Sequence, residues 1–78
     1  MTTLQNLRLG TGMSQSQLAK ASGVQLRTIQ AYEIDARDIN KADMEIIFKL
    51  CNALKCSLDE LLTDKDLLKI INTYMDNN

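Results

Sequence analysis

The 78-residue sequence predicts an all-α fold, a bundle of five helices with a candidate sixth helix at the C-terminal end. The chain has no proline, and its apolar residues recur at helical spacing throughout. Its β-branched residues never alternate over the length of a strand, which argues against a sheet. A chain of this length has room for only one hydrophobic core.

The first helix is expected to take Thr2 or Thr3 as its N-cap and to end at Gly10-Thr11-Gly12. The second helix, at about residues 15–22, follows a capping box in which Ser14 is the N-cap and Gln17 is its partner three residues later. Gly23 can adopt a positive φ without a Cβ clash, so we expect a sharp turn there.

The third helix should start at Gln25 or Leu26 and run to about Ile34, although Gln25 is a poor N-cap. Its buried positions are expected to be Ile29 and Tyr32, with Val24 pointing inward just before the helix. On a helical wheel Arg27 and Ala31 lie opposite Ile29, and Thr28 and Gln30 lie at the flanks. A helix–turn–helix of this form exposes its second helix, which can enter a DNA major groove.

A loop at residues 35–41, anchored by Ile39, separates this motif from a fourth helix at about residues 42–54. The buried stripe of the fourth helix has the i, i+3, i+4 spacing of a core-facing surface and comprises Ile46 or Ile47, Leu50, Cys51 and Leu54. A short fifth helix follows Ser57 as N-cap, with Glu60 at the capping-box position.

The tail from Thr63 onward is expected to form the sixth helix, from Asp64 to about Met75, with Thr63 or Asp64 as its cap. Its apolar stripe is Leu67, Leu68, Ile71, Tyr74 and Met75. Three roles fit this stripe: packing against its own domain, pairing with a second subunit, or binding another protein.

The net charge of −1 hides an uneven distribution. Residues 1–42 carry five basic and three acidic side chains, a balance of +2, whereas residues 43–78 carry four lysines and seven acidic residues, a balance of −3. Because attraction to phosphate is screened within about 10 Å at ordinary salt, an acidic far side does not forbid DNA binding by the basic half.

The sequence shows no arrangement of catalytic residues, so we do not expect an enzyme. The chain has no histidine, and its two cysteines, Cys51 and Cys56, are too few ligands for a zinc site, so we expect no metal, no cofactor and two reduced thiols. No apolar run is long enough to cross a membrane, and the N-terminus lacks a signal-peptide pattern. We therefore expect a cytoplasmic protein.

The sequence resembles the Cro/cI-like, XRE-type helix-turn-helix regulators of bacteria and phages over roughly residues 1–62. The matching residues are Arg8, Met13-Ser14-Gln15, Leu18-Ala19, Ser22-Gly23-Val24, Ile29, Tyr32-Glu33, Leu50, Ala53-Leu54, Ser57 and Leu61-Leu62. The resemblance implies a five-helix, lambda-repressor-like DNA-binding domain at residues 1–62, followed by an amphipathic helix or tail at residues 63–78. One departure is Asp35, where the family often has glycine. We therefore expect a different end to the third helix.

The resemblance implies an ion pair between Arg8 and Glu33 that joins the first and third helices. It also implies phosphate contacts by Gln15, and we extend these to its neighbour and the loop. The predicted phosphate-binding residues are Ser14, Gln15, Arg37, Asn40 and Lys41. The predicted base-reading residues are Gln25, Leu26, Arg27, Thr28, Gln30 and Ala31. Arg27 is the first candidate, because arginine can bind guanine in bidentate fashion, although it could instead meet only a phosphate.

These observations predict a sequence-specific DNA-binding transcriptional regulator, most simply a repressor, that binds double-stranded DNA as a homodimer. No small-molecule effector is evident. The alternative is an antitoxin-like or scaffold module whose helix–turn–helix serves protein contacts, which the acidic second half and the apolar tail would suit.

Overall fold

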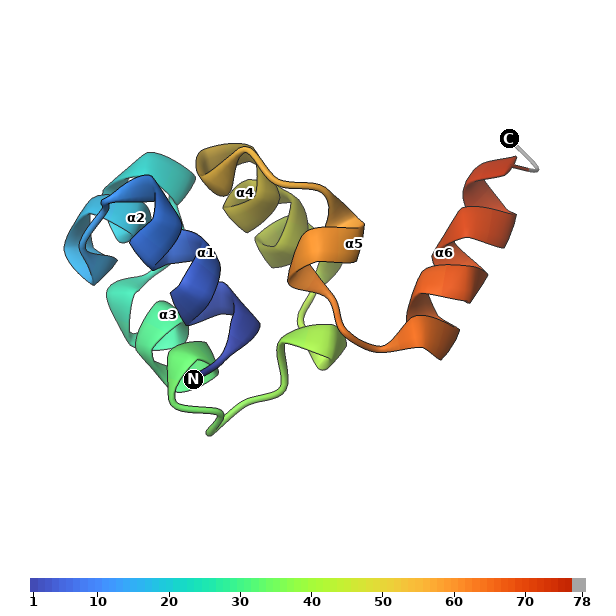
Figure 1. Cartoon of the computed structure of the whole chain (residues 1–78), viewed down its shortest axis with the longest axis horizontal. Helices are drawn as coiled ribbons and strands as arrows, with labels where there is room; N and C mark the ends of the chain where they lie inside the picture. The colour runs from blue at the N-terminus through green and yellow to red at the C-terminus, as the bar shows by residue number, and fades with distance from the viewer. Residues whose placement is uncertain (77–78) are drawn as a thin grey trace.

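The computed structural model describes residues 1–76, and over that range it contains six α-helices, one short 3-10 helix and no strand (Figure 1). In chain order the elements are α1 (Thr3–Thr11), α2 (Gln15–Ser22), α3 (Leu26–Glu33), η1 (Ile39–Lys41), α4 (Met44–Leu54), α5 (Leu58–Leu61) and α6 (Lys65–Asp76). The predicted all-α fold is confirmed, including the sixth helix. The last two residues of the predicted tail, 77–78, lie outside the described range.

The helix ends in the first third of the chain follow the sequence signals. Thr2 caps α1, because its Oγ1 accepts a hydrogen bond from Gln5 N at 3.3 Å. The capping box of α2 is complete: Ser14 Oγ accepts from Gln17 N at 3.1 Å, and Gln17 Oε1 accepts from Ser14 N at 2.8 Å. Gly23 ends α2 with φ +78°, the left-handed conformation that makes glycine useful there.

The end of α3 corrects one expectation. Asp35 adopts φ +62°, so the chain takes the same left-handed conformation that a glycine would allow. Aspartate is among the few non-glycine residues that reach this region. The turn is held by two further hydrogen bonds, from Ala36 N at 2.9 Å and Arg37 N at 3.2 Å, both to Ala31 O. At the other end of α3, Gln25 gives no side-chain cap.

The predicted start of the fourth helix was two residues too early. Ala42 is extended, with ψ 155°, Asp43 is also non-helical, with ψ 143°, and α4 begins at Met44. The reason is η1: Ala42 N donates to Ile39 O at 3.1 Å and completes that turn, so the chain must leave it before a new helix can start. Ile39 packs against the core, as expected of the loop's anchor.

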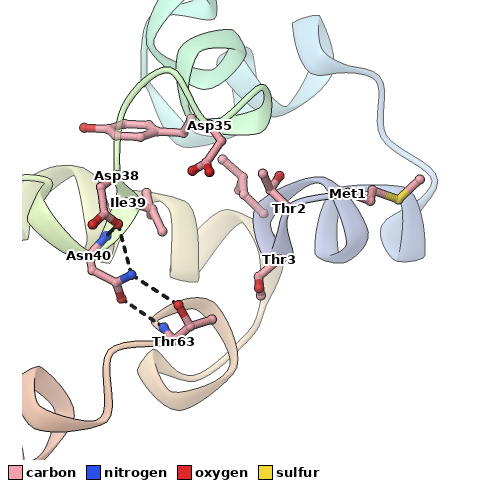
Figure 2. A pocket seen from close by; sticks show the side chains of 10 residues that line it. Met1, Thr2, Thr3, Asp35, Asp38, Ile39, Asn40 and Thr63 are labelled. Atoms are coloured by element: carbon pink, nitrogen blue, oxygen red, sulfur yellow. Dashed lines mark hydrogen bonds between the residues drawn. The ribbon is translucent and has the colours of Figure 1, made fainter.

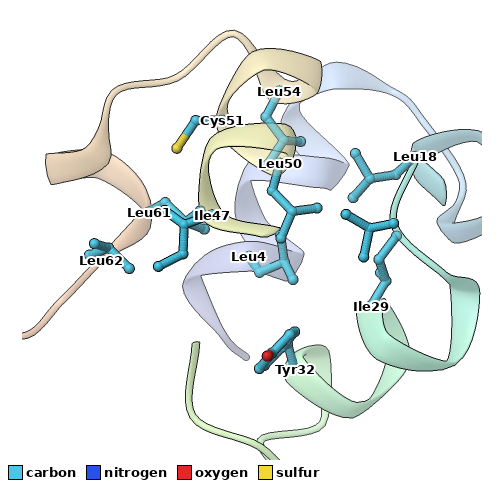
Figure 3. Packing of buried hydrophobic residues seen from close by; sticks show 11 residues of the cluster. Leu4, Leu18, Ile29, Tyr32, Ile47, Leu50, Cys51, Leu54, Leu61 and Leu62 are labelled. Atoms are coloured by element: carbon cyan, nitrogen blue, oxygen red, sulfur yellow. The ribbon is translucent and has the colours of Figure 1, made fainter. Parts of the chain in front are cut away.

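The helices α1 to α5 enclose one hydrophobic core (Figure 3). Of the two candidates for the first buried position of α4, Ile46 and Ile47, it is Ile47 that is buried, with 1% of its surface exposed. The side chains that are almost completely buried are Leu4, Leu18, Ile29, Ile47, Leu50, Leu61 and Leu62. These come from all five helices, so each helix is fixed relative to the others by the shared core.

Both cysteines are free, and both lie in or beside the core as expected. Cys51 is buried on α4, and its Sγ is 3.8 Å from the Ser57 carbonyl oxygen. Burial raises the pKa of Cys51 to about 12, with a further contribution from the neighbouring Cys56 thiol. Burial also raises the pKa of Cys56. Thiols that hold their protons so firmly are unreactive at neutral pH.

The last helix, α6, projects from the end of the bundle that is remote from α2 (Figure 1). The molecule is accordingly elongated, with extents of 37 × 22 × 20 Å. Asp64 caps α6, since its Oδ1 accepts from Asp66 N at 3.0 Å and from Leu67 N at 3.1 Å. No residue of α6 is fully buried. Within residues 1–76, no helix combines the length and the apolarity needed to span a membrane.

Candidate nucleic-acid interface

The outer face of α3 presents most of the predicted base-reading residues. Gln25, Leu26, Arg27 and Gln30 are exposed, and Thr28 and Ala31 are partly exposed. On the opposite face Ile29, Tyr32 and Glu33 are buried. The side chains of Arg27 and Gln30 make no hydrogen bond or ion pair with any other residue in the described range, so their donors are available to a ligand.

A buried ion pair fixes α3 to α1. Arg8 Nε donates to Glu33 Oε2 at 2.7 Å, and Arg8 Nη2 donates to Glu33 Oε1 at 3.0 Å. The two side chains are only 10% and 1% exposed. The hydrogen bonds to Glu33 raise the pKa of Arg8 above its ordinary value. The predicted pair is therefore present as a bidentate fork, the strongest form of this contact.

The same carboxylate reaches the start of α2. Gln15 Nε2 donates to Glu33 Oε1 at 3.1 Å, and Arg8 Nη1 donates to the Met13 carbonyl oxygen at 2.9 Å. A further bond joins Thr2 Oγ1 to the Glu33 carbonyl oxygen at 3.1 Å. These contacts hold the first turn of α2 at a fixed place beside the end of α3. Gln15 thus has a structural partner as well as its predicted ligand.

The loop after α3 carries two exposed cationic side chains, Arg37 and Lys41. The Arg37 guanidinium lies over the Tyr32 ring, 5.3 Å from its centroid, which is the geometry of a cation–π contact. Lys41 ends η1, and its side chain makes no hydrogen bond or ion pair with another described residue. Both side chains retain charge that can meet a phosphate.

Asn40 lies in the same loop, but its side chain is turned to internal partners. The amide accepts from Thr63 N and donates to Asp38 Oδ1 and Thr63 Oγ1 (Figure 2). It also accepts from Asp64 N. No donor of the amide remains for a phosphate in this arrangement.

A second surface lies between α4 and α6. A groove of about 460 Å³ has an entirely apolar lining, although its walls are exposed. Its lining residues are Met44, Phe48, Ile70, Ile71, Tyr74 and Met75. Ile70 is 66% exposed and Phe48 is 45% exposed. Apolar side chains gathered in this way usually mark an interaction site.

The bundle and the exposed α3 define the class of protein: a helix–turn–helix domain whose second helix is exposed. The comparison with protein families agrees, because the family model described as Helix-turn-helix matches residues 4–61. The chain belongs to this Cro/cI-like, XRE-type helix-turn-helix family and is a DNA-binding regulator of that class. Neither the curated proteins nor the solved structures that were compared with the chain gave a match.

Sequence reasoning missed three features of this region. The Gln15–Glu33 bond joins residues 18 apart, and the Asn40–Thr63 bonds join residues 23 apart. The groove combines residues of α4 with residues of α6. Each of these features depends on where two segments distant in the sequence meet in space. No local sequence pattern predicts such a contact.

Proposed function

We propose that this protein is a sequence-specific transcriptional regulator, acting as a repressor, that inserts α3 into the major groove of double-stranded DNA. The observation that carries the proposal is that Arg27, on the face opposite Ile29, and Gln30, at the flank of that face, are both exposed and have unpaired side chains. Arginine and glutamine side chains can each form two hydrogen bonds with a base edge, to guanine and adenine respectively. A rigid helix keeps that geometry at low entropic cost.

Phosphate contacts would orient α3 in the groove. We assign them to Ser14 and Gln15 at the start of α2 and to Arg37 and Lys41 in the following loop. The start of a helix presents free backbone N–H groups that suit an anion. Asn40, also predicted for this role, would contribute only by holding the loop in place, because its side-chain amide and its backbone N–H are both engaged internally.

We further propose that the regulator is a homodimer in which the α4–α6 groove of each copy receives α6 of the other. Two copies on an inverted repeat double the number of DNA contacts. The surface suits a twofold contact: if two α6 helices run antiparallel, Lys65 at one end lies near Asp76 at the other end of the second copy. Apolar side chains then meet at the centre.

The test is binding of the full chain to a pool of genomic DNA fragments at several salt concentrations. We expect a small set of fragments to be retained at salt that releases the bulk of the pool. The double variant Arg27→Ala/Gln30→Ala should lose this selectivity. The matched control Lys49→Ala, on the exposed side of α4, should keep it. Retention of no fragment, or of all fragments alike, would contradict the proposal.

The alternative is an antitoxin-like or scaffold module, and one observation favours it: the apolar α4–α6 groove lies in the acidic half of the chain. In that case the groove would bind a different protein. The chain would then be monomeric by itself in solution and would show no selective retention of DNA.

A further inference from the structure

We propose that Asn40 is a positioning residue that fixes the direction in which α6 leaves the domain, and thereby sets the spacing between the two DNA half-sites. The inference rests on the proposed DNA binding and on dimerisation through α6. It is carried by a hydrogen-bonded clasp made of Asn40, Thr63 and Asp64, which ties the loop after α3 to the segment before α6. Figure 2 shows the bonds between Asn40 and Thr63.

The Asn40 side chain uses its full hydrogen-bonding capacity in the clasp. Its Oδ1 accepts from Thr63 N at 2.9 Å and from Asp64 N at 3.0 Å. Its Nδ2 donates to Thr63 Oγ1 at 3.2 Å and to Asp38 Oδ1 at 3.0 Å. A primary amide has two N–H donors and one oxygen with two lone pairs, so every position is filled. A carboxylate of the same shape could not donate, and an alkyl group could do neither.

Each end of the clasp is anchored in a functional element. On one side Asp38 Oδ1 also accepts from Asn40 N at 3.0 Å, which fixes the amide within the loop that carries Arg37 and Lys41. On the other side Asp64 Oδ1 accepts from Leu67 N at 3.1 Å and so caps α6. A continuous series of hydrogen bonds therefore joins the proposed DNA-facing loop to the first turn of the proposed dimer helix.

Few contacts hold α6 against the core, so we expect the clasp to fix the direction of this helix. Only Leu67, Leu68 and Ile71 of α6 pack against the core, and each remains partly exposed. Thr63 and Asp64 are exposed, so water can replace the amide at their N–H groups if Asn40 is removed. Loss of the Asn40 side chain should therefore leave the domain folded while α6 takes a wider range of directions.

The consequence for DNA follows from twofold symmetry. A dimer binds half-sites whose separation equals the distance between its two exposed α3 helices, about 34–36 Å for one helical turn. If α6 carries the dimer contact, its angle to α3 determines that distance. A firm clasp selects one spacing, whereas a loosened one accepts several.

The test is selection from a pool of random double-stranded DNA by the full-length protein and by Asn40→Ala. We expect the natural chain to favour one half-site spacing by about tenfold, and the variant to enrich the same half-site sequence with adjacent spacings within about twofold of one another. Asn52→Ala, an exposed asparagine on α4 without a side-chain hydrogen bond, is the matched control and should keep the single spacing. A folded Asn40→Ala that also keeps the single spacing would overturn the inference.

Two further arms keep the test decisive. If circular dichroism shows that Asn40→Ala does not fold, Thr63→Val removes only the bond to Thr63 Oγ1 and should broaden the spacing in the same sense. If the natural chain enriches no DNA, the proposed function fails, and the clasp is tested without DNA. Spin labels at Asn6→Cys and Asn72→Cys, in a Cys51→Ala/Cys56→Ala background, should then report a broader distance distribution when Asn40 is alanine. An unchanged distribution would refute the role of the clasp.

Discussion

Arg8 and Glu33 form a buried bidentate ion pair that joins α1 to α3, with Arg8 Nε donating to Glu33 Oε2 at 2.7 Å. Glu33 is followed by the loop that carries Arg37 and Lys41. Its carboxylate also accepts a hydrogen bond from the side chain of Gln15 in α2. The pair, with the Gln15 contact, therefore fixes the positions of α1, α2 and α3 relative to one another.

Removing one partner of this pair should be strongly destabilising. Arg8→Met leaves a buried carboxylate with Gln15 as its remaining side-chain donor, which should lower the free energy of unfolding by about 3–5 kcal/mol. Arg8→Met combined with Glu33→Leu should cost less than the two single changes together, because no unpaired charge remains. Urea unfolding of the four proteins gives the coupling energy, and a value near zero would show that the two residues act independently.

Lys41→Ala should weaken DNA binding by a similar factor for every sequence. A lysine that meets one phosphate releases about one counterion, so the slope of log K against log salt should fall by about 0.9. Binding isotherms between low and moderate salt measure this slope. Lys49→Ala, on the acidic half, is the matched control and should leave it unchanged. An identical slope for Lys41→Ala would place that side chain outside the interface.

The two capping boxes and the buried stripes were predictable because each depends on residues three or four positions apart. Ser14 with Gln17 and Ser57 with Glu60 are examples, and both are present in the structure. The start of α4 was misplaced because η1 competes for the same residues, and the left-handed Asp35 was unexpected because local propensity is weaker than the constraint of the loop.

The tertiary parts of the candidate site were less accessible from sequence. The Arg8–Glu33 contact was found through a family resemblance, while the use of Asn40 in the clasp was not found at all. The amide of Asn40 has the same chemistry whether it faces a phosphate or Thr63, and only the fold shows which partner is within reach. The roles of Arg27, Lys41 and the other proposed DNA contacts remain predictions.

The stability of the protein should fall above pH 9 partly through Cys51. Burial raises the pKa of Cys51 to about 12 from an ordinary value of 9.0, so the folded chain keeps a proton that the unfolded chain releases. The contribution is fully present below pH 9 and is lost as the pH rises towards about 12. Within that window the natural chain should lose up to about 1.4 kcal/mol per pH unit more than Cys51→Ala does.

The measurement is the free energy of unfolding in urea from pH 7 to the highest pH at which both proteins fold. A constant offset between them reflects the smaller alanine side chain and does not affect the comparison. Stability profiles that stay parallel above pH 9 would show that the Cys51 thiol titrates normally.

Ile70→Asp should convert the proposed dimer into a monomer. Ile70 lines the α4–α6 groove and is 66% exposed, so a charge there disrupts the interface without entering the core. Self-association, measured by sedimentation velocity, should weaken by at least about tenfold. Asn72→Asp changes an exposed residue of the same helix outside the groove and should have little effect. A dimer that survives Ile70→Asp would move the interface to another face.

The most direct test of the central proposal concerns Arg27. Binding of the natural chain and of Arg27→Ala is compared across a set of operators that differ by single base pairs. If Arg27 reads guanine, the variant should lose about 1–3 kcal/mol of discrimination at one base position in each half-site and keep its preferences elsewhere. A variant that binds all operators more weakly but with an unchanged preference profile would show that Arg27 meets only a phosphate, and would contradict base reading by this residue.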